Sequence, residues 1–256
     1  YDFPDGIFLV SLSGLGSSEA FLPALGSTLS VTFQRDWGDP FAQLLGYLQH
    51  RRLLLILDSF EEALEASAWL VRLLQEAPGL QFLVTSRARL NIQAERVFPL
   101  EGLEYPHPAD LDRAELNLMD FAALQLFQDT ARQVRPDYTI PAADLPAVVR
   151  ICQLVGGLPL GLVLAAGWLG TCSAREIAEE IERSLDFLSA TWSDLPERQR
   201  SLRATLDHSW QLLSPAERQA FQKLSVFQGA FTRPSAEQVA QVSSTGLRLL
   251  IDKSML

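Results

Sequence analysis

The sequence is poor in lysine, cysteine and histidine, and each scarcity limits its chemistry. Only two lysines occur, Lys223 and Lys253, both near the C-terminal end. The two cysteines, Cys152 and Cys172, lack metal-ligand spacing and are too few for a disulfide framework. We therefore expect two core thiols in a reduced, cytoplasmic protein. The three histidines lie far apart without Cys or Glu partners at ligand spacing, which argues against a zinc site.

Long apolar runs and an excess of basic residues are also missing. No apolar run approaches the roughly 20 residues needed to cross a bilayer, and residues 1–10 lack the features of a signal peptide. The net charge of −10 repels a phosphate backbone. We therefore expect neither a membrane nor nucleic acid as a partner of this segment. Tyr1 precedes a strand-like run almost at once, which indicates a fragment that begins part-way through a fold.

The first hundred residues alternate apolar strands with amphipathic helices. Strands are expected at 7–14, 51–58 and 80–87, with a short fourth at 96–100, and helices at 17–29, 39–50 and 60–77. Apolar strands separated by helices predict an α/β fold, a parallel sheet with flanking helices on both faces.

The rest of the chain reads as helices only. The segment 117–134 predicts a helix, and the capping box Ser173–Glu176 predicts another that runs through Leu188. The apolar residues on one face of the first are Phe121, Leu124, Phe127, Ala131 and Val134. These helices predict an all-α domain after the sheet.

A third section begins near Pro196. The segment Ser214–Glu217 forms another capping box, with Pro215 at the favoured first helical position. Short helices here are typical of a winged-helix-like bundle, whose β wing would lie beyond Leu256. The expected domains are 1–104, 105–195 and 196–256.

The expected second strand ends in a carboxylate, Asp58. Open parallel sheets bind ligands at the carboxyl edge of their strands, and a carboxylate there can hold Mg²⁺, through water, beside phosphates. Glu61 and Glu62 follow within one helical turn and could polarise a water. The alternative is that Asp58 only caps the helix that follows.

The next strand delivers Thr85, Ser86 and Arg87 to the same edge. A guanidinium there can pair bidentately with a terminal phosphate and so distinguish ATP from ADP. The alternative is an ordinary solvated strand end.

A rigid turn, Gly157-Leu158-Pro159, lies between helices in the second section. It could pack against a flat nucleotide base, or it could be a tight connection between two helices.

A phosphate-binding loop is missing. Its motif, G-x-x-x-x-G-K-[ST], uses backbone amides and a lysine to cradle the phosphates. The glycine cluster at 13–20 has no lysine, and none occurs before Lys223. We interpret Gly14 and Gly16 as turn residues.

The order and spacing of LLLILDSFE, LVTSRARL, VFPLEGL, VGGLPLGLVLAA and HSWQLLSPAERQAFQKLSVFQGAF resemble the bacterial STAND-class P-loop NTPases of the NB-ARC type. The resemblance covers nearly the whole chain. It implies a partial P-loop NTPase domain, a helical domain with a GLPL motif and a winged-helix domain, with the phosphate-binding loop upstream. It also implies that Asp58 is the Mg²⁺ ligand, Arg87 the γ-phosphate sensor and Pro159 a neighbour of adenine.

The sequence departs from this pattern in several places. Ser59 stands where Asp or Asn is usual, which weakens the case for hydrolysis, and Gly161 stands where Ala is common. Gly229-Ala230 replaces a glycine pair. A histidine motif that contacts ADP in this family would come shortly after Leu256.

The resemblance implies a fragment of an ADP/ATP-dependent signalling switch, which couples nucleotide exchange to domain opening and oligomerisation. The whole protein would bind ATP or ADP with Mg²⁺ as a slow regulatory ATPase, beside effector and sensor domains, and this fragment alone would be inactive. Two alternatives stay open. One is a non-catalytic scaffold, motivated by Ser59 and the missing loop. The other is part of a transcriptional regulator acting through residues 196–256, whose mixed charges argue against DNA reading.

Overall fold

The computed structural model describes residues 2–15, 17–34, 36, 38–111, 117–189, 200–227 and 229–256. The chain forms two compact units. The first, called here the sheet unit, contains residues 1–97 together with 215–256, and the second, the helical unit, contains residues 98–214.

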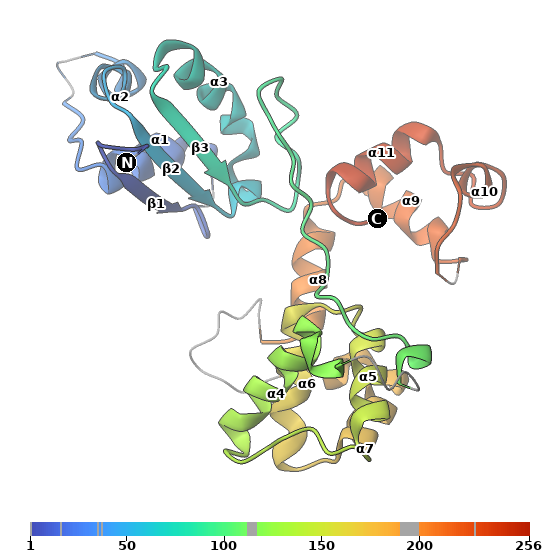
Figure 1. The fold of residues 1–256 in the computed structure, drawn as a ribbon. Coiled ribbons are helices and arrows are strands. Elements are labelled where there is room, and N and C mark those ends of the chain that lie inside the picture. The colour runs from blue at the N-terminus through green and yellow to red at the C-terminus, as the bar shows by residue number, and fades with distance from the viewer. Residues whose placement is uncertain are drawn as a thin grey trace. The chain divides into compact units, whose positions relative to one another are not determined.

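The sheet unit contains three parallel strands in the order β1-β2-β3 (Figure 1). They are β1 (Ile7–Ser11), β2 (Leu53–Asp58) and β3 (Leu80–Val84). The predicted parallel sheet with helices is therefore confirmed. The predicted fourth strand at 96–100 is wrong, because this segment pairs with no strand and Phe98 and Leu100 are exposed.

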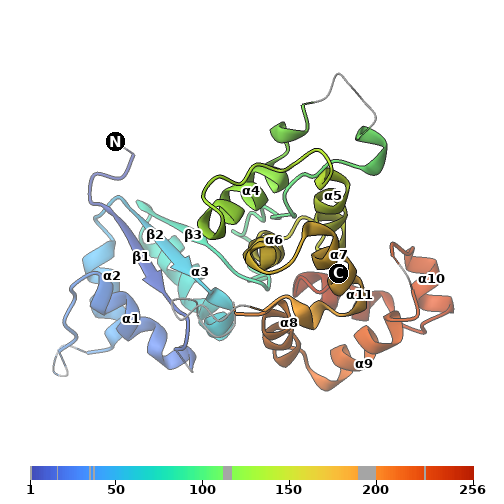
Figure 2. The same cartoon turned by 90° about the horizontal axis from the view of Figure 1, so that it is seen from below.

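Helices cover one face of this sheet. A turn of 3₁₀ helix (Ser18–Ala20) leads into α1 (Phe21–Thr28), α2 is Pro40–Leu48, and a 3₁₀ segment (Phe60–Ala66) leads into α3 (Ser67–Glu76). Figure 2 shows α1 and α2 on the same side of the strands. Their apolar residues bury Val10, Leu55 and Leu57 of the strands completely.

The expectation that helices cover both faces is wrong for the described residues. Ile7, Leu9 and Leu83 on the other face are 59%, 64% and 55% exposed. The cause is topological: the sheet grows in one direction, so right-handed crossovers place every connecting helix on the same side.

The C-terminal part of the sheet unit consists of α9 (Pro215–Leu224), α10 (Arg233–Gln238) and α11 (Ser244–Asp252). Leu224 and Leu250 are buried between α9 and α11. The backbone N–H of Arg89 donates to the carbonyl of Asp252 at 2.7 Å, which ties the segment after β3 to the end of α11. The described residues place three helices in this region, and its winged-helix identity stays a prediction.

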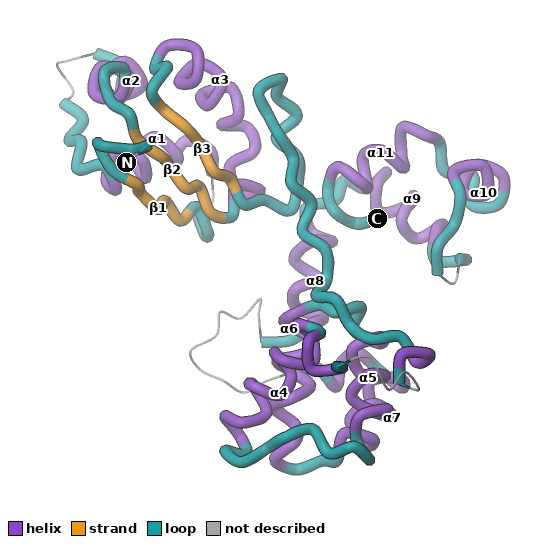
Figure 3. The backbone as a smooth tube through the Cα atoms, viewed as in Figure 1, coloured by secondary structure: helices purple, strands orange, loops and turns teal. Residues whose placement is uncertain are grey.

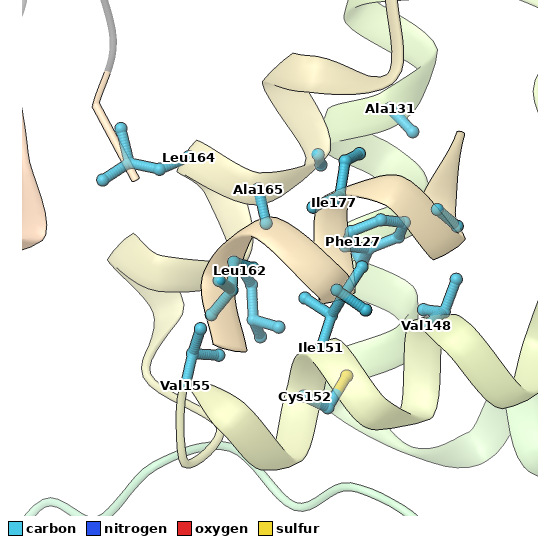
Figure 4. Packing of buried hydrophobic residues seen from close by; sticks show 14 of the residues in the cluster. Phe127, Ala131, Val148, Ile151, Cys152, Val155, Leu162, Leu164, Ala165 and Ile177 are labelled. Carbon is cyan, nitrogen blue, oxygen red and sulfur yellow. The ribbon is translucent and has the colours of Figure 1, made fainter. Parts of the chain in front are cut away.

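The helical unit consists of helices joined by loops (Figure 3), and these helices pack around one apolar core (Figure 4). Its α-helices are α4 (Ala122–Val134), α5 (Leu145–Leu154), α6 (Pro159–Gly167), α7 (Ala174–Arg183) and α8 (Leu202–Gln211). Its 3₁₀ turns are Pro108–Asp110, Leu118–Asp120, Trp168–Gly170 and Leu185–Phe187. Phe127 of α4, Ile151 of α5 and Leu162 of α6 are fully buried in this core.

The predicted capping box Ser173–Glu176 at the start of α7 is confirmed. The N–H of Ser173 donates to the carboxylate of Glu176 at 2.8 Å, and the Ser173 hydroxyl accepts from the N–H of Glu176. The helix ends at Arg183 rather than Leu188, because Ser184 is extended and starts a 3₁₀ turn. Of the five residues predicted on one apolar face, Val134 is 39% exposed, so the C-terminal end of this face is not buried.

The predicted division at 195/196, including Pro196, lies outside the described residues, as does Gly16. The helix that follows, α8, begins with Leu202, which is buried in the core of the helical unit. The two compact units divide at 97/98 and 214/215, and the predicted three-domain division stays a prediction.

Candidate functional site

A hydrogen-bonded group joins the carboxyl ends of β2 and β3. The hydroxyl of Thr85 donates to Oδ1 of Asp58 at 2.6 Å and accepts from the N–H of Ser59 at 3.1 Å. The N–H of Phe60 donates to the carbonyl of Thr85 at 3.0 Å. Because the Asp58 carboxylate accepts a hydrogen bond from the end of the neighbouring strand, it joins the two strands at the sheet edge.

Ser59 turns the chain sharply after Asp58. It is buried and lies in the left-handed region, with φ of 63° and ψ of 49°. This conformation is more accessible to Asn and Asp than to Ser. The turn directs the next residues back under the sheet edge, which places Glu61 near the end of β3.

Glu61 is the buried partner of Arg87. The N–H of Arg87 donates to Glu61 Oε2 at 3.3 Å, and its Nε lies 3.7 Å from Oε1. The Glu61 side chain is 4% exposed and that of Arg87 is 29% exposed. Arg87 is therefore no solvated strand end, and Glu61 neutralises a guanidinium in a place where we expected it to polarise a water.

The other residues at this edge have smaller roles in the structure. The Ser86 hydroxyl accepts from the N–H of Ala88 at 3.1 Å and so shapes the turn after β3. The N–H of Glu62 donates to the carbonyl of Ser59 at 3.3 Å, and Glu62 is half-buried. Ser11, which sequence reasoning missed, is in register with Asp58 at the end of β1. Its place directly after the apolar run Ile7–Val10 is the signal that could have found it.

These residues fit only part of a Mg²⁺-nucleotide site. Asp58 offers one carboxylate, so it could hold Mg²⁺ only with water ligands, and Arg87 could reach a phosphate by leaving Glu61. The described residues contain no group of three or more His, Cys, Asp or Glu side chains able to hold a metal. They also supply no lysine-bearing amide cradle, since Gly14 and its neighbours come without a lysine.

The predicted base-binding turn ends α5. Gly156 and Gly157 are left-handed, at φ of 61° and 67°. Their N–H groups donate to the carbonyls of Gln153 and Cys152 at 3.1 and 2.9 Å, the Schellman pattern of a helix end.

This turn also touches a second piece of backbone. The carbonyl of Gly157 accepts from the N–H of Leu103 at 2.8 Å, and a Cβ at Gly157 would collide with the Leu103 carbonyl oxygen. Pro159 starts α6, while Leu158 is 47% exposed. The structure thus gives the turn a role as a tight connection. Gly157, Leu158 and Pro159 belong to the helical unit and Asp58 and Arg87 to the sheet unit.

No known protein-family profile matches the chain. It is similar to "Putative HTH-type transcriptional regulator Rv0890c" of Mycobacterium tuberculosis and to "Putative HTH-type transcriptional regulator Mb0914c" of Mycobacterium bovis, at 29% identity over 98% of this chain and 28% of each relative. It is also similar to "Uncharacterized protein Rv0894" of Mycobacterium tuberculosis, at 30% identity over 77% of this chain and 47% of that protein.

The chain thus spans little more than a quarter of the length of the named regulators. In the part of the chain that the structure describes, no helix combines the length and hydropathy that crossing a membrane requires.

Proposed function

We propose that this chain is the regulatory part of a transcriptional regulator, in which it controls DNA binding made by another part of the protein. The observation that carries this proposal is similarity along 98% of the chain to proteins named as HTH-type transcriptional regulators. Because the match covers 28% of each relative, the remaining length has room for a separate DNA-binding domain.

The charges of α9, α10 and α11 support the assignment of DNA contact to another part. A DNA-reading surface needs a stripe of basic side chains available to phosphates and bases. Here Arg233 pairs with Glu237 at 3.1 Å and Lys253 with Glu217 at 2.7 Å. Arg248 lies 3.7 Å from Asp252. These acidic partners neutralise the surface that would have to approach DNA.

We further propose that the signal is a nucleotide at the carboxyl edge of the sheet, as the resemblance to STAND NTPases implies. Asp58 would hold Mg²⁺ through water, and Arg87 would bind a terminal phosphate. The Mg²⁺-nucleotide would supply the negative charge that competes with Glu61 for the guanidinium of Arg87. The phosphate-cradling loop would come from outside residues 1–256.

The segment after β3 offers a route from this edge to the C-terminal helices. Arg87 pairs with Glu61, and two residues later Arg89 binds Asp252 through both its N–H and its guanidinium. A guanidinium that moves from Glu61 to a phosphate would pull on the short backbone between Arg87 and Arg89. The contact with α11 is therefore placed to respond to the charge at the sheet edge.

The test uses the full-length protein and its promoter DNA in a binding assay, with and without Mg²⁺ and ATP or ADP. We expect the nucleotide to change DNA affinity at least several-fold. Arg87→Ala should remove this nucleotide effect while leaving nucleotide-free DNA binding in place. The matched control is Arg175→Ala, because Arg175 pairs with Glu179 on an exposed helix surface.

Two results would contradict the proposal. An Arg87→Ala protein that still responds fully to nucleotide would remove Arg87 from the sensing site. Salt-sensitive DNA binding by residues 1–256 alone would place the DNA contact within this chain.

A second candidate function is a non-catalytic scaffold. It is favoured by two observations: Glu61 already neutralises Arg87, and the described residues lack a lysine-bearing phosphate cradle. Calorimetry of the full-length protein with ATP and ADP separates the two. Absence of binding to either nucleotide would favour the scaffold, whereas Mg²⁺-dependent binding weakened by Asp58→Ala would favour the switch.

A further inference from the structure

Within the sheet unit, the face of the sheet opposite its helices is apolar and not covered by them. We call it the open face and define it by the aliphatic residues Ile7, Leu9, Leu54, Ile56 and Leu83. Strand register aligns Leu9 with Ile56 and Ile56 with Leu83 across the three strands. The two edge strands leave Ile7, Leu9 and Leu83 more than half exposed, and Leu54 and Ile56 of the central strand are partly exposed.

This face has the composition of a core. None of its five residues is charged, and the polar position in the same rows is Gln81, in register with Leu54. Parallel sheets occur almost only with both faces covered, and contiguous exposed apolar patches usually mark a contact surface. Because the crossovers place α1, α2 and α3 on the far side, the cover must come from an element other than these three.

The dimensions of the open face indicate which kind of secondary-structure element can cover it. Strands spaced about 4.8 Å apart with a rise of about 3.3 Å per residue give three strands, paired over five residues, a width of about 14 Å and a length of about 16 Å. An α-helix is about 10 Å in diameter and rises about 1.5 Å per residue, so roughly eleven residues match this length. One helix of three turns therefore fits the face.

The area argues against a second copy of the chain as the occupant. A footprint of about 14 Å by 16 Å is roughly 220 Å², whereas a stable interface buries about 800 Å² on each partner. So small a contact holds only when its two sides are tethered, which raises their effective concentration. The relatives extend well beyond their match to this chain, so comparable proteins contain additional polypeptide.

We propose that the open face is covered by one amphipathic helix of the same polypeptide, from outside residues 1–256, with an uncharged aliphatic stripe against Ile7, Leu9, Ile56 and Leu83. This helix completes the two-sided cover of the sheet. Its end would lie beside the polar row of Ser11, Asp58 and Thr85, because these residues continue the same face at the carboxyl edge.

The test measures thiol labelling in the full-length protein and in residues 1–256. Leu9→Cys and Leu83→Cys are made separately in a Cys172→Ser background, where the remaining Cys152 is fully buried. Glu19→Cys, at an exposed position in the 3₁₀ turn before α1, is the matched control. We expect maleimide to label Leu9→Cys and Leu83→Cys at least tenfold more slowly in the full-length protein, with Glu19→Cys unchanged.

A photo-crosslinking amino acid at Leu9 then identifies the cover by mass spectrometry. Crosslinks at i, i+3 or i+4, and i+7 within one segment outside residues 1–256 of the same molecule are expected. Crosslinks between isotopically light and heavy copies would overturn the proposal in favour of self-association. Crosslinks to residues 98–256, or unchanged labelling of both cysteines, would also overturn it.

Discussion

The sheet region, residues 2–97, and the helical region, residues 98–214, bury their apolar residues to different extents. In the helical region, α4, α5, α6 and α7 all contribute to one core, and residues such as Phe127 and Leu162 are completely buried (Figure 4). In the sheet region, Leu55 is completely buried while Leu9 on the adjacent strand is 64% exposed. The helices of the helical region bury one another's apolar residues. In the sheet region the crossovers place the helices on one face of the three strands, so the other face is not buried by them.

The largest expected effect separates the two faces of the sheet. Leu55→Ala should lower the free energy of unfolding of the sheet region by about 2–5 kcal/mol, because it leaves a cavity under the helices. Leu9→Ala in the same 256-residue chain should cost under about 0.5 kcal/mol, because its side chain already meets solvent. Hydrogen exchange of the β2 amides in each variant measures this difference in the stability of the sheet region. Equal losses would show that the open face is packed.

The next effect concerns backbone contact in the helical region. In Gly156→Ala the added Cβ contacts no neighbouring atom, so the substitution costs only the strain of an alanine in the left-handed backbone conformation, about 1–2 kcal/mol. Ala at Gly157 carries the same penalty and also collides with the backbone of Leu103. We expect Gly157→Ala to lower stability by at least about 1 kcal/mol more than Gly156→Ala in urea denaturation. Equal costs would mean that residues 102–103 move aside freely.

The sequence predicted the strands better than their surroundings. Continuous apolar runs such as Leu53–Leu57 identify buried strands, and all three lie where expected. The exposure of Ile7 and Leu83 could not be predicted, because the same continuous apolar runs occur in sheets with one covered face and in sheets with two. The segment 96–100 looked like a strand because Val97, Phe98 and Leu100 are apolar, yet strand pairing depends on partners that local sequence does not specify.

The candidate site shows the same limit. Strand ends predicted that Asp58 and Thr85 share one sheet edge, because parallel strands bring their carboxyl ends together, and the structure joins them by a hydrogen bond. The burial of Glu61 against Arg87 depends on the left-handed turn at Ser59. The identity of Ser59 does not predict such a turn, so the ion pair could not be inferred from the sequence.

A smaller effect tests this ion pair. Glu61→Gln should lower the free energy of unfolding of the sheet region by about 1–3 kcal/mol, because a buried hydrogen-bonded charge loses its partner. Glu179→Gln is the control in the helical region, where Glu179 pairs with Arg175 in solvent and should contribute under about 0.5 kcal/mol. Urea denaturation of both variants gives the comparison. A neutral Glu61→Gln would show that Arg87 is stable without this carboxylate.

The last effect depends on pH, is absent below pH 9, and concerns the helical core alone. Burial raises the pKa of the Cys152 thiol from its ordinary value of 9.0 to about 12. Below pH 9 the thiol is protonated in both states and its full contribution to stability is present. Between about pH 9 and 12 the unfolded state loses the proton while the folded state keeps it, so stability falls as pH rises, by about 1.4 kcal/mol per pH unit for this group.

Cys152→Ala should therefore flatten the pH dependence of unfolding in this range, whereas Cys172→Ala, at a partly exposed thiol, should leave it in place. Hydrogen exchange resolved by region decides whether the effect is local. Amides of α5, which carries Cys152 in the closed core, should lose protection with rising pH beyond the chemical change in exchange rate. Amides of β2 should show no Cys152-dependent change, because the two cores are separate clusters. An equal Cys152-dependent loss in β2 would mean that the two regions unfold as one cooperative unit.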